Sequence, residues 1–280
     1  MKYQVVNMKR TRSITSWIVA GIVACFWLPG CSSEQPLGEM QPLEIEATIP
    51  GLTKADTPLE KTAFVADDSI TVSKSSTTSA VYKFDATNSR WLPKVGTGLS
   101  TTGNEAFTAS WKPEGFTAIL SDQQTAGHYQ KSYELTASAT ASANLVQFSF
   151  APAAAKITIV VNYALESSGG SASITGSHLL SSDDGDQTIN FWPLQATGKK
   201  HTFVGLVFPG SGKSYQISVV ATPSDGSPET KTHSMTGKTL KAGYNYTYNF
   251  STDNTPNLIL NSVTVTDFKP ETDTNVGEAT

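Results

Sequence analysis

The stretch Leu43-Glu44-Ile45-Glu46-Ala47-Thr48-Ile49 decides the class of fold that the sequence predicts. Its apolar residues occupy every second position, and its acidic and hydroxyl residues occupy the positions between them. Successive side chains of an extended chain point to opposite faces, so this period of two predicts a strand with one buried and one solvated face. Pro50-Gly51 follows directly and ends the strand.

Similar short segments recur along the rest of the chain, separated by turns rich in Gly, Ser, Asp and Pro. We predict strands at 69–73, 80–85, 107–111, 116–120, 144–150, 156–163, 188–192, 202–208, 215–221, 244–250 and 258–268. Many short strands with almost no helical periodicity predict an all-β chain of the sandwich type. The run Ala151-Pro152-Ala153-Ala154-Ala155 is a shift in composition, and we place a boundary there between domains at 43–152 and 153–280.

The first 30 residues have the layout of an export signal. Four basic residues and no acid accompany an apolar stretch from Ile14 to Leu28. This stretch is short for a membrane span, which needs about 20 apolar residues. It ends in Leu28-Pro29-Gly30-Cys31-Ser32, which resembles a bacterial lipobox, and the resemblance implies lipid on Cys31. We therefore predict a lipoprotein signal peptide at 1–30, a flexible tether at 31–42 and an anchor in the outer membrane.

Composition excludes several classes of protein. The 280 residues carry 20 basic and 24 acidic side chains, and only 16% of residues are charged. Removal of the leader leaves 16 basic against 24 acidic side chains, a net charge of −8. No basic stripe offsets this acidity, so we expect no nucleic-acid partner. The low charge also argues against a coiled coil. Cys31 would be the last cysteine, which leaves no disulfide within the chain.

Motifs for catalysis or metal binding are weak. Residues 210–214 read Gly-Ser-Gly-Lys-Ser, like the end of a phosphate-binding loop, but Val207 stands where the first glycine of that motif belongs. We interpret them as a hairpin turn. Residues 183–186 lack the spaced ligands of a calcium loop and are interpreted as a solvated turn. We predict no enzyme, no cofactor and no metal site.

A set of features occurs in a fixed order along most of the chain after the leader. They are the lipobox; the strand at 43–49; a basic residue soon after it, Lys54; Phe64-Val65-Ala66-Asp67-Asp68-Ser69-Ile70; Val81-Tyr82-Lys83-Phe84-Asp85 with Trp91; Ala155-Lys156-Ile157-Thr158-Ile159; and Leu240-Lys241-Ala242-Gly243-Tyr244-Asn245-Tyr246-Thr247-Tyr248 before a last strand. This order resembles the fimbrillin family, the lipoprotein-derived (type V) pilins and their relatives. The resemblance implies two tandem transthyretin-like β-sandwich domains and a role as a pilus or adhesion subunit.

The resemblance also implies assembly by strand donation. In such pilins a protease removes the first strand, and a C-terminal segment of the next subunit fills the groove as an added strand. The removable face would here be Leu43, Ile45, Ala47 and Ile49. Cutting after Lys54 or Lys61 would release it together with the lipid. The partners would be other pilin subunits, the outer membrane through the lipid on Cys31, and a ligand on a host or bacterial surface.

The expected donor segment is 257–280. Its candidate incoming side chains are Leu258, Leu260, Val263, Val265 and Phe268. The parity of this set shifts between Leu260 and Val263, which predicts a bulge or two short strands.

Other interpretations stay open. Both segments would be permanent strands if the chain is a monomeric anchor or accessory protein. A carbohydrate-binding outer-membrane lipoprotein would use exposed aromatic rings for sugar stacking, and the candidates are Trp91, Trp111 and Trp192. We favour core positions for these rings, because a large ring beside a strand usually fills the core. A hydrolase would require distant acids gathered in one cleft.

Overall fold

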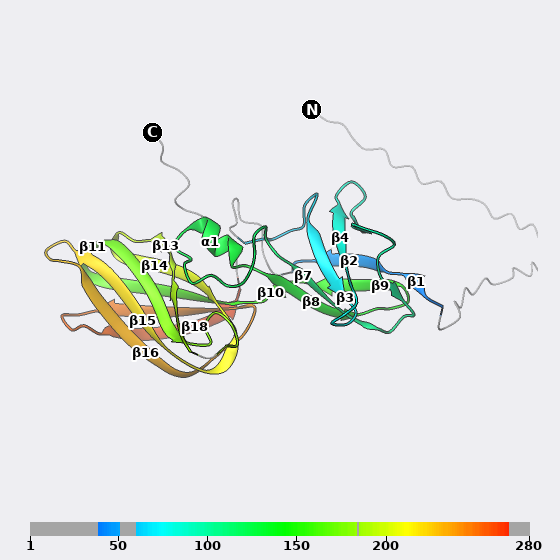
Figure 1. The fold of residues 1–280 in the computed structure, drawn as a ribbon. Helices are drawn as coiled ribbons and strands as arrows, with labels where there is room; N and C mark the ends of the chain where they lie inside the picture. The colour runs from blue at the N-terminus through cyan, green and yellow to red at the C-terminus, as the bar shows by residue number, and fades with distance from the viewer. Residues whose placement is uncertain (1–38, 51–59, 184, 269–280) are drawn as a thin grey trace, which may run out of the picture. The chain divides into compact units, whose positions relative to one another are not determined.

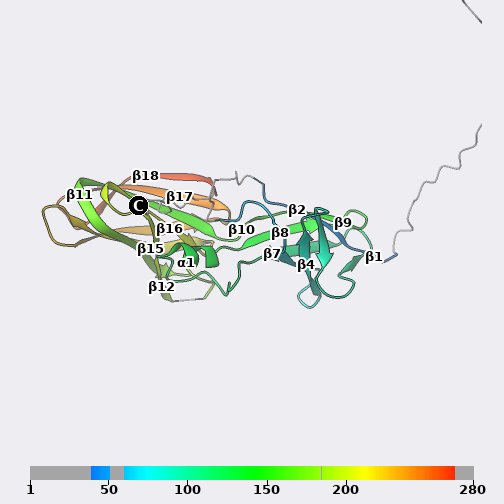
Figure 2. The ribbon, with the colours of Figure 1, turned by 90° about the horizontal axis from the view of Figure 1, so that it is seen from above.

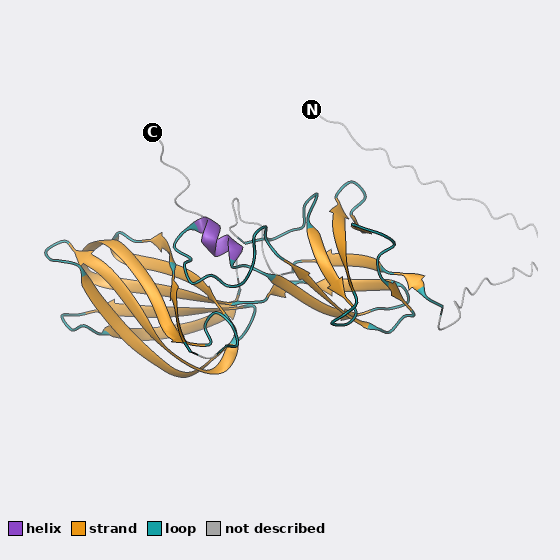
Figure 3. Cartoon of the chain, viewed as in Figure 1, coloured by secondary structure: helices purple, strands orange, loops and turns teal. Residues whose placement is uncertain are grey.

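The computed structural model describes residues 39–50, 60–183 and 185–268. Almost all regular structure in these ranges is strand (Figures 1 and 3). The elements are β1 (Gln41–Pro42), β2 (Glu44–Thr48), β3 (Ser69–Ser73), β4 (Ser79–Asp85), β5 (Arg90–Pro93), β6 (Ser100–Thr101), β7 (Ala106–Trp111), α1 (Ala126–Lys131), β8 (Leu135–Thr140), β9 (Leu145–Ser149), β10 (Ala151–Pro152), β11 (Ala155–Ser177), β12 (Asp186–Asn190), β13 (Trp192–Gln195), β14 (Gly198–Val207), β15 (Gly210–Pro223), β16 (Glu229–Leu240), β17 (Tyr244–Thr252) and β18 (Leu258–Asp267). The all-β class predicted from the sequence is confirmed.

The strands of the first half form an antiparallel sheet in the order β10-β8-β7-β3-β4-β5. The alternation that predicted these strands is also visible in their burial. In β3, Ile70 and Val72 have no exposed surface, and Thr71 between them is exposed. Because side chains alternate along a strand, one face of this sheet covers a core and the other meets solvent. β4 and β5 pair antiparallel as a hairpin, with Phe84 opposite Trp91.

The first two strands pair elsewhere. β1 runs antiparallel to β6, and β2 runs parallel to β9. Seen from above, β2 lies beside β9 (Figure 2). β9 itself follows β8 through a tight turn in which Ala143 has a φ of 53°. The start of the chain is thus placed against strands that come much later in the sequence.

The strands of the second half surround β11. Its first part, Lys156 to Asn162, pairs with β14 on one side and in parallel with β17 on the other. Its last part, Ser173 to Ser177, pairs with β12 and β15. β13 and β16 extend the sheet beyond β14 and β15, and β18 extends it beyond β17. One long strand therefore belongs to two sets of neighbours.

Glycine makes this change of neighbours feasible. The pairing register of β11 shifts between Asn162 and Ser167 against β14, and between Ser168 and Ser171 against β15. Within this interval Gly169 has a φ of 62°, where side chains are strained. A Cβ atom on Gly170 would lie 2.4 Å from Nδ1 of His201. The bend therefore needs both backbone freedom and an absent side chain.

Two groups of buried side chains form the core. One fills the space around β3, β7, β8 and β9 and also takes in Trp192, Leu206 and Phe268 from later in the chain. The other lies around β11, β14, β15 and β17 and includes Ile157, Phe203 and Tyr248. No disulfide is needed for either group, since apolar burial at roughly 25 cal/mol per Å² is the main stabilising contribution.

Some predicted elements are wrong. Residues 116–120 are not a strand: the turn that begins at Pro113 closes with the Phe116 N–H donating to the Pro113 oxygen at 3.1 Å, and a loop follows. Gln41 and Pro42, placed in the flexible tether by the sequence, form β1. The two errors differ in origin: residues 116–120 are apolar enough to suggest a strand but pair with no strand among the described residues, whereas β1 is a two-residue pairing decided by its distant partner β6.

The glycine-rich residues 210–214 are not a hairpin turn but the beginning of β15. β14 and β15 do not pair with each other, because β11 lies between them. Lys213 of this segment is buried, and its ammonium donates to the backbone oxygen of His178 and lies 5.6 Å from the Phe208 ring centre. β16 and α1 are elements that the sequence patterns did not predict.

Candidate functional site

The first candidate site is β2 on its partner β9. Leu43 and Ile45 are 7% and 6% exposed. Ala47 and Ile49 are partly buried and pack against the same core. Glu44 and Glu46, on the opposite face, are exposed. The four apolar residues that the sequence assigns to the removable face all lie on the core side of the strand.

The ladder holds β2 along one side only. Within the described residues its strand partner is β9, with Ile45 opposite Val146 and Ala47 opposite Phe148. A further bond at the end of the strand joins the Phe150 N–H to the Thr48 oxygen at 2.8 Å. A strand paired on a single edge can leave without breaking the pairing of two neighbours. β2 has this property.

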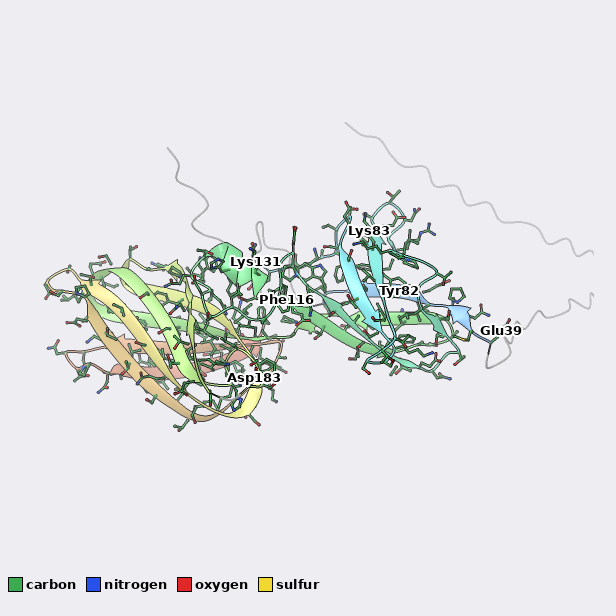
Figure 4. The ribbon with its side chains drawn as sticks, in the orientation of Figure 1. Glu39, Tyr82, Lys83, Phe116, Lys131 and Asp183 are labelled. Carbon is green, nitrogen blue, oxygen red and sulfur yellow. The ribbon has the colours of Figure 1, made fainter. Side chains whose placement is uncertain are left out.

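A relay of hydrogen bonds fixes the point where β2 begins. The Leu43 N–H donates to the Leu99 oxygen at 2.9 Å, and the Leu99 N–H donates to the Tyr82 hydroxyl at 2.7 Å. Burial raises the pKa of Tyr82, which projects from β4 (Figure 4). Gly98 has a φ of 76°, and a Cβ there would lie 2.7 Å from the Tyr82 oxygen. The approach of this loop to Tyr82 therefore requires glycine.

Glu105 supports β6, the partner of β1. Its carboxylate accepts hydrogen bonds from the Lys74 ammonium at 2.7 Å and from the Thr102 N–H at 2.8 Å, and also from the Thr101 hydroxyl. These donors, with that of Lys74 the strongest influence, lower the pKa of Glu105 to about 2. A charged Glu105 thus holds the loop against which the start of the chain pairs.

Of the two candidate cut positions, Lys61 lies within the described residues. Lys54 lies outside the described residues. The Lys61 side chain is 12% exposed, and its ammonium lies 2.7 Å from a carboxylate oxygen of Asp68 and 5.0 Å from the Trp111 ring centre. A lysine-specific protease must take the whole side chain into its pocket. In the folded chain the Lys61 side chain is therefore not accessible to such a pocket.

The candidate donor residues lie on β18. Leu258 is 2% exposed and Leu260 is partly buried, whereas Val263 and Val265 are 44% and 51% exposed. Val263 and Val265 stand opposite the buried residues Tyr248 and Tyr246. Directly opposed residues share a face, so these valines are on the core side but uncovered. The apolar row begins in the core and continues into solvent.

The predicted irregularity in this row is confirmed. Asn249 pairs with Ser262, and the next residue, Phe250, pairs with Leu260, so Asn261 is an extra residue in β18. Such a bulge realigns the side chains on either side of it. It brings Leu258 and Leu260 onto the same face as Val263 and Val265.

β18 is also an edge strand. Its strand partner among the described residues is β17, and the stretch from Leu258 to Thr266 has no charged residue. Edge strands normally carry lysine, proline, a bulge or a short length that prevents pairing with another chain. Over its ten residues β18 has the bulge at Asn261 but no lysine or proline.

The tryptophans are placed in or against the core. Trp91 is 6% exposed and packs edge-on against Phe64, with ring centres 5.0 Å apart. Trp192 is 4% exposed, and its ring centre is 5.8 Å from that of Tyr129. Trp111 is partly buried, and the Lys61 ammonium lies over it. These positions leave no open platform for sugar stacking on the three rings.

A buried ion pair was missed by the sequence reasoning. The Lys156 ammonium lies 3.5 Å from a carboxylate oxygen of Glu60, and both side chains are 0% exposed. The Tyr129 hydroxyl donates to the same oxygen at 2.7 Å. A signal was present, because Lys156 interrupts the apolar run of β11, but its partner comes from a distant part of the chain. Glu60 is the first described residue after the candidate cut at Lys54.

Several predicted features cannot be placed. Cys31, Lys54 and residues 269–280 lie outside the described residues. In the ranges that are described, no helix has the length and apolar character needed to cross a membrane.

Comparison with solved structures identifies the fold. The crystal structure of a candidate cell-adhesion protein from Bacteroides ovatus matches 83% of this chain and 98% of its own, with a TM-score of 0.50 and 18% identity. A second, from Bacteroides uniformis, matches 80% and 98%, with a TM-score of 0.50 and 14% identity. The chain has the fold of these cell-adhesion proteins.

A looser match is the C-terminally truncated tip fimbrial protein Mfa3 from Porphyromonas gingivalis, with a TM-score of 0.41 and 7% identity over 74% of this chain and 95% of its own. No protein-family model and no curated protein sequence matches the chain.

Proposed function

We propose that this chain is a fimbrillin-like pilus or adhesion subunit of the bacterial surface, and not an enzyme. The observation that carries the proposal is the state of β2. It contributes Leu43 and Ile45 to a core but is paired in a ladder only with β9 among the described residues. Its removal would leave a groove lined by apolar side chains and one open strand edge, which together form a template for an added strand.

The same proposal assigns β18 as the incoming strand. Its alternating residues Leu258, Leu260, Val263 and Val265 have the spacing of the four residues that leave, apart from the bulge at Asn261. Leu258 and Leu260 would exchange one buried site for another, whereas Val263 and Val265, 44% and 51% exposed in the folded chain, would newly be covered. Full burial of a large apolar side chain contributes about 1.5–3 kcal/mol before the cost of ordering. Two transthyretin-like domains, divided near Pro152, and a lipid on Cys31 in the outer membrane belong to this proposal as well.

The cut that starts assembly would fall between β2 and β3. Lys54 and Lys61 are the basic residues available there. Lys61 is held by Asp68 and Trp111, so a cut after Lys61 requires local opening of the chain. A cut after Lys54 would keep Glu60, and with it the buried ion pair to Lys156, in the processed subunit.

The proposal is tested with residues 31–280 carrying Cys31→Ser, so that lipid is not needed. Limited digestion with trypsin, followed by mass spectrometry, identifies the loss of the first strand. We then expect oligomers in size-exclusion chromatography and extended polymers in electron micrographs. A matched variant with Val263→Glu and Val265→Glu, both exposed in the folded chain, adds no trypsin site and should be cut equally but should not assemble. Complete cutting without oligomers would reject strand donation and favour a monomeric anchor or accessory protein.

A further inference from the structure

Phe268, at the end of the proposed donor strand, is connected through buried side chains to the segment that holds the candidate cut at Lys61. Its ring is 3% exposed, and its N–H donates to the Gly243 oxygen at 2.9 Å. Phe268 directly follows β18, while Glu60 and Lys61 directly precede the segment leading to β3. Two separate rows of contacts connect Phe268 to these two neighbouring residues.

The first row passes through Lys156. The Lys156 ammonium lies 4.5 Å from the Phe268 ring centre and 3.5 Å from the Glu60 carboxylate. A buried ammonium is attracted by an aromatic face, and the attraction grows when water is excluded. Phe268 is therefore one wall of the site that keeps the Glu60–Lys156 pair dry.

The second row passes through aromatic rings. The Phe268 ring centre is 5.7 Å from that of Tyr133, and Tyr133 is 6.4 Å from Trp111. Trp111 in turn carries the Lys61 ammonium at 5.0 Å, and its indole N–H donates to Asp68, the ion-pair partner of Lys61, at 3.3 Å. Removal of Phe268 would therefore loosen the support of Lys61 through two ring contacts.

Tyr133 shows that this region is closed to water. Its hydroxyl is buried without a hydrogen-bond partner among the described residues. Burial, with a smaller contribution from the negative charge of Glu60, raises the pKa of Tyr133. An unpaired buried hydroxyl costs free energy that hydration would recover. If the Phe268 ring were withdrawn, water could reach and hydrate the Tyr133 hydroxyl, which would favour local opening.

We propose that Phe268 controls the access of a lysine-specific, trypsin-like protease to the peptide bond between Lys61 and Thr62. The protease hydrolyses this amide bond, and water supplies the hydroxyl to the Lys61 carbonyl carbon and the proton to the Thr62 nitrogen. With Phe268 in place, Glu60 and Lys61 are both held and the bond is protected. Departure of Phe268 with β18 exposes it. The regulation concerns the cut site of the proposed function and in that sense rests on it.

The cutting rate of the uncut monomer tests this without any assembly. Phe268→Ala is compared with two controls: Ile259→Ala, which changes an exposed residue of β18 outside the donor set, and Met235→Ala, which changes a residue that is 4% exposed in the other core group. Cleavage after Lys61 by dilute trypsin is followed by mass spectrometry, and each rate is divided by the unfolded fraction from urea titration. We expect Phe268→Ala to accelerate this cut about tenfold beyond Met235→Ala, because local opening adds to global unfolding. Ile259→Ala should match the wild type.

Equal normalised rates in Phe268→Ala and Met235→Ala would overturn the proposal, since protection would then reflect global stability alone. If Phe268→Ala does not fold, Phe268→Leu decides, because it keeps apolar volume but removes the aromatic face. We expect it to accelerate the cut about threefold, and an unchanged rate would overturn the proposal. The cutting rate does not depend on polymer formation. A chain that is cut as expected but does not assemble would therefore reject the proposed function and leave the regulation of the cut by Phe268 standing.

Discussion

The Lys156 ammonium and the Glu60 carboxylate lie 3.5 Å apart with neither side chain exposed. Removing one partner of a buried ion pair leaves an uncompensated charge and costs about 3–5 kcal/mol. We therefore expect Lys156→Met to lower the free energy of unfolding by that amount in a urea titration. The triple variant Glu60→Met, Lys156→Met, Tyr129→Phe should recover most of the loss, because it removes the ion pair together with the Tyr129 hydroxyl that donates to Glu60. A loss in the single variant below about 1 kcal/mol would contradict a buried pair.

The first strand should show the asymmetry of its two faces. Ile45 is 6% exposed, so Ile45→Ala should lower the free energy of unfolding by about 2–5 kcal/mol through lost contacts and a cavity. Glu44, exposed on the other face, is the control, and Glu44→Ala should change it by less than about 0.5 kcal/mol. Equal effects of the two substitutions would mean that β2 has no inward face.

The free energy of unfolding that is lost on substitution by alanine should decrease along β18, from its buried start to its exposed end. Leu258, 2% exposed, should cost about 2–5 kcal/mol when replaced by alanine. Val265, 51% exposed on the same side of the sheet, should cost less than about 0.5 kcal/mol. Thermal or urea unfolding of the two variants measures this difference. A large loss for Val265→Ala would show that the end of β18 is covered by another part of the chain.

Glu105 should make stability depend on pH. Its pKa of about 2 in the folded chain lies below the model-peptide value of about 4.3 for an unfolded glutamate. The stabilisation is therefore complete above about pH 4.3 and is lost as the pH falls toward 2. The difference in urea midpoint between wild type and Glu105→Gln should be largest near pH 6 and should shrink on acidification. A difference that stays constant from pH 6 to pH 3 would argue against this role.

Trp91 should matter for folding. Its ring packs against Phe64 and Phe84 at centre distances of 5.0 and 5.1 Å. Trp91→Ala should lower the free energy of unfolding by about 3–5 kcal/mol. A variant of normal stability that had lost affinity for a glycan would instead revive the carbohydrate-binding interpretation.

The sequence by itself determined the features that local geometry controls. The strict alternation of Leu43 to Ile49 gave a strand with the correct inward face, and the shift in parity after Leu260 gave the bulge at Asn261. These features follow from the alternating direction of side chains along an extended chain, which needs no knowledge of distant residues. The short helix α1 escaped prediction because its six residues are too few for a repeat, and the loop at 116–120 was wrongly predicted as a strand.

Tertiary structure alone decided which distant residues meet. The parallel pairing of β2 with β9, the burial of Lys156 against Glu60, and the position of Phe268 on Lys156 all join segments far apart in the sequence. Such contacts depend on how the sheets close and on which edges remain free, and a pattern of alternating residues is the same whichever partner it finds. The sequence thus predicted strands suited to exchange, and the folded chain decided which residues hold them in place.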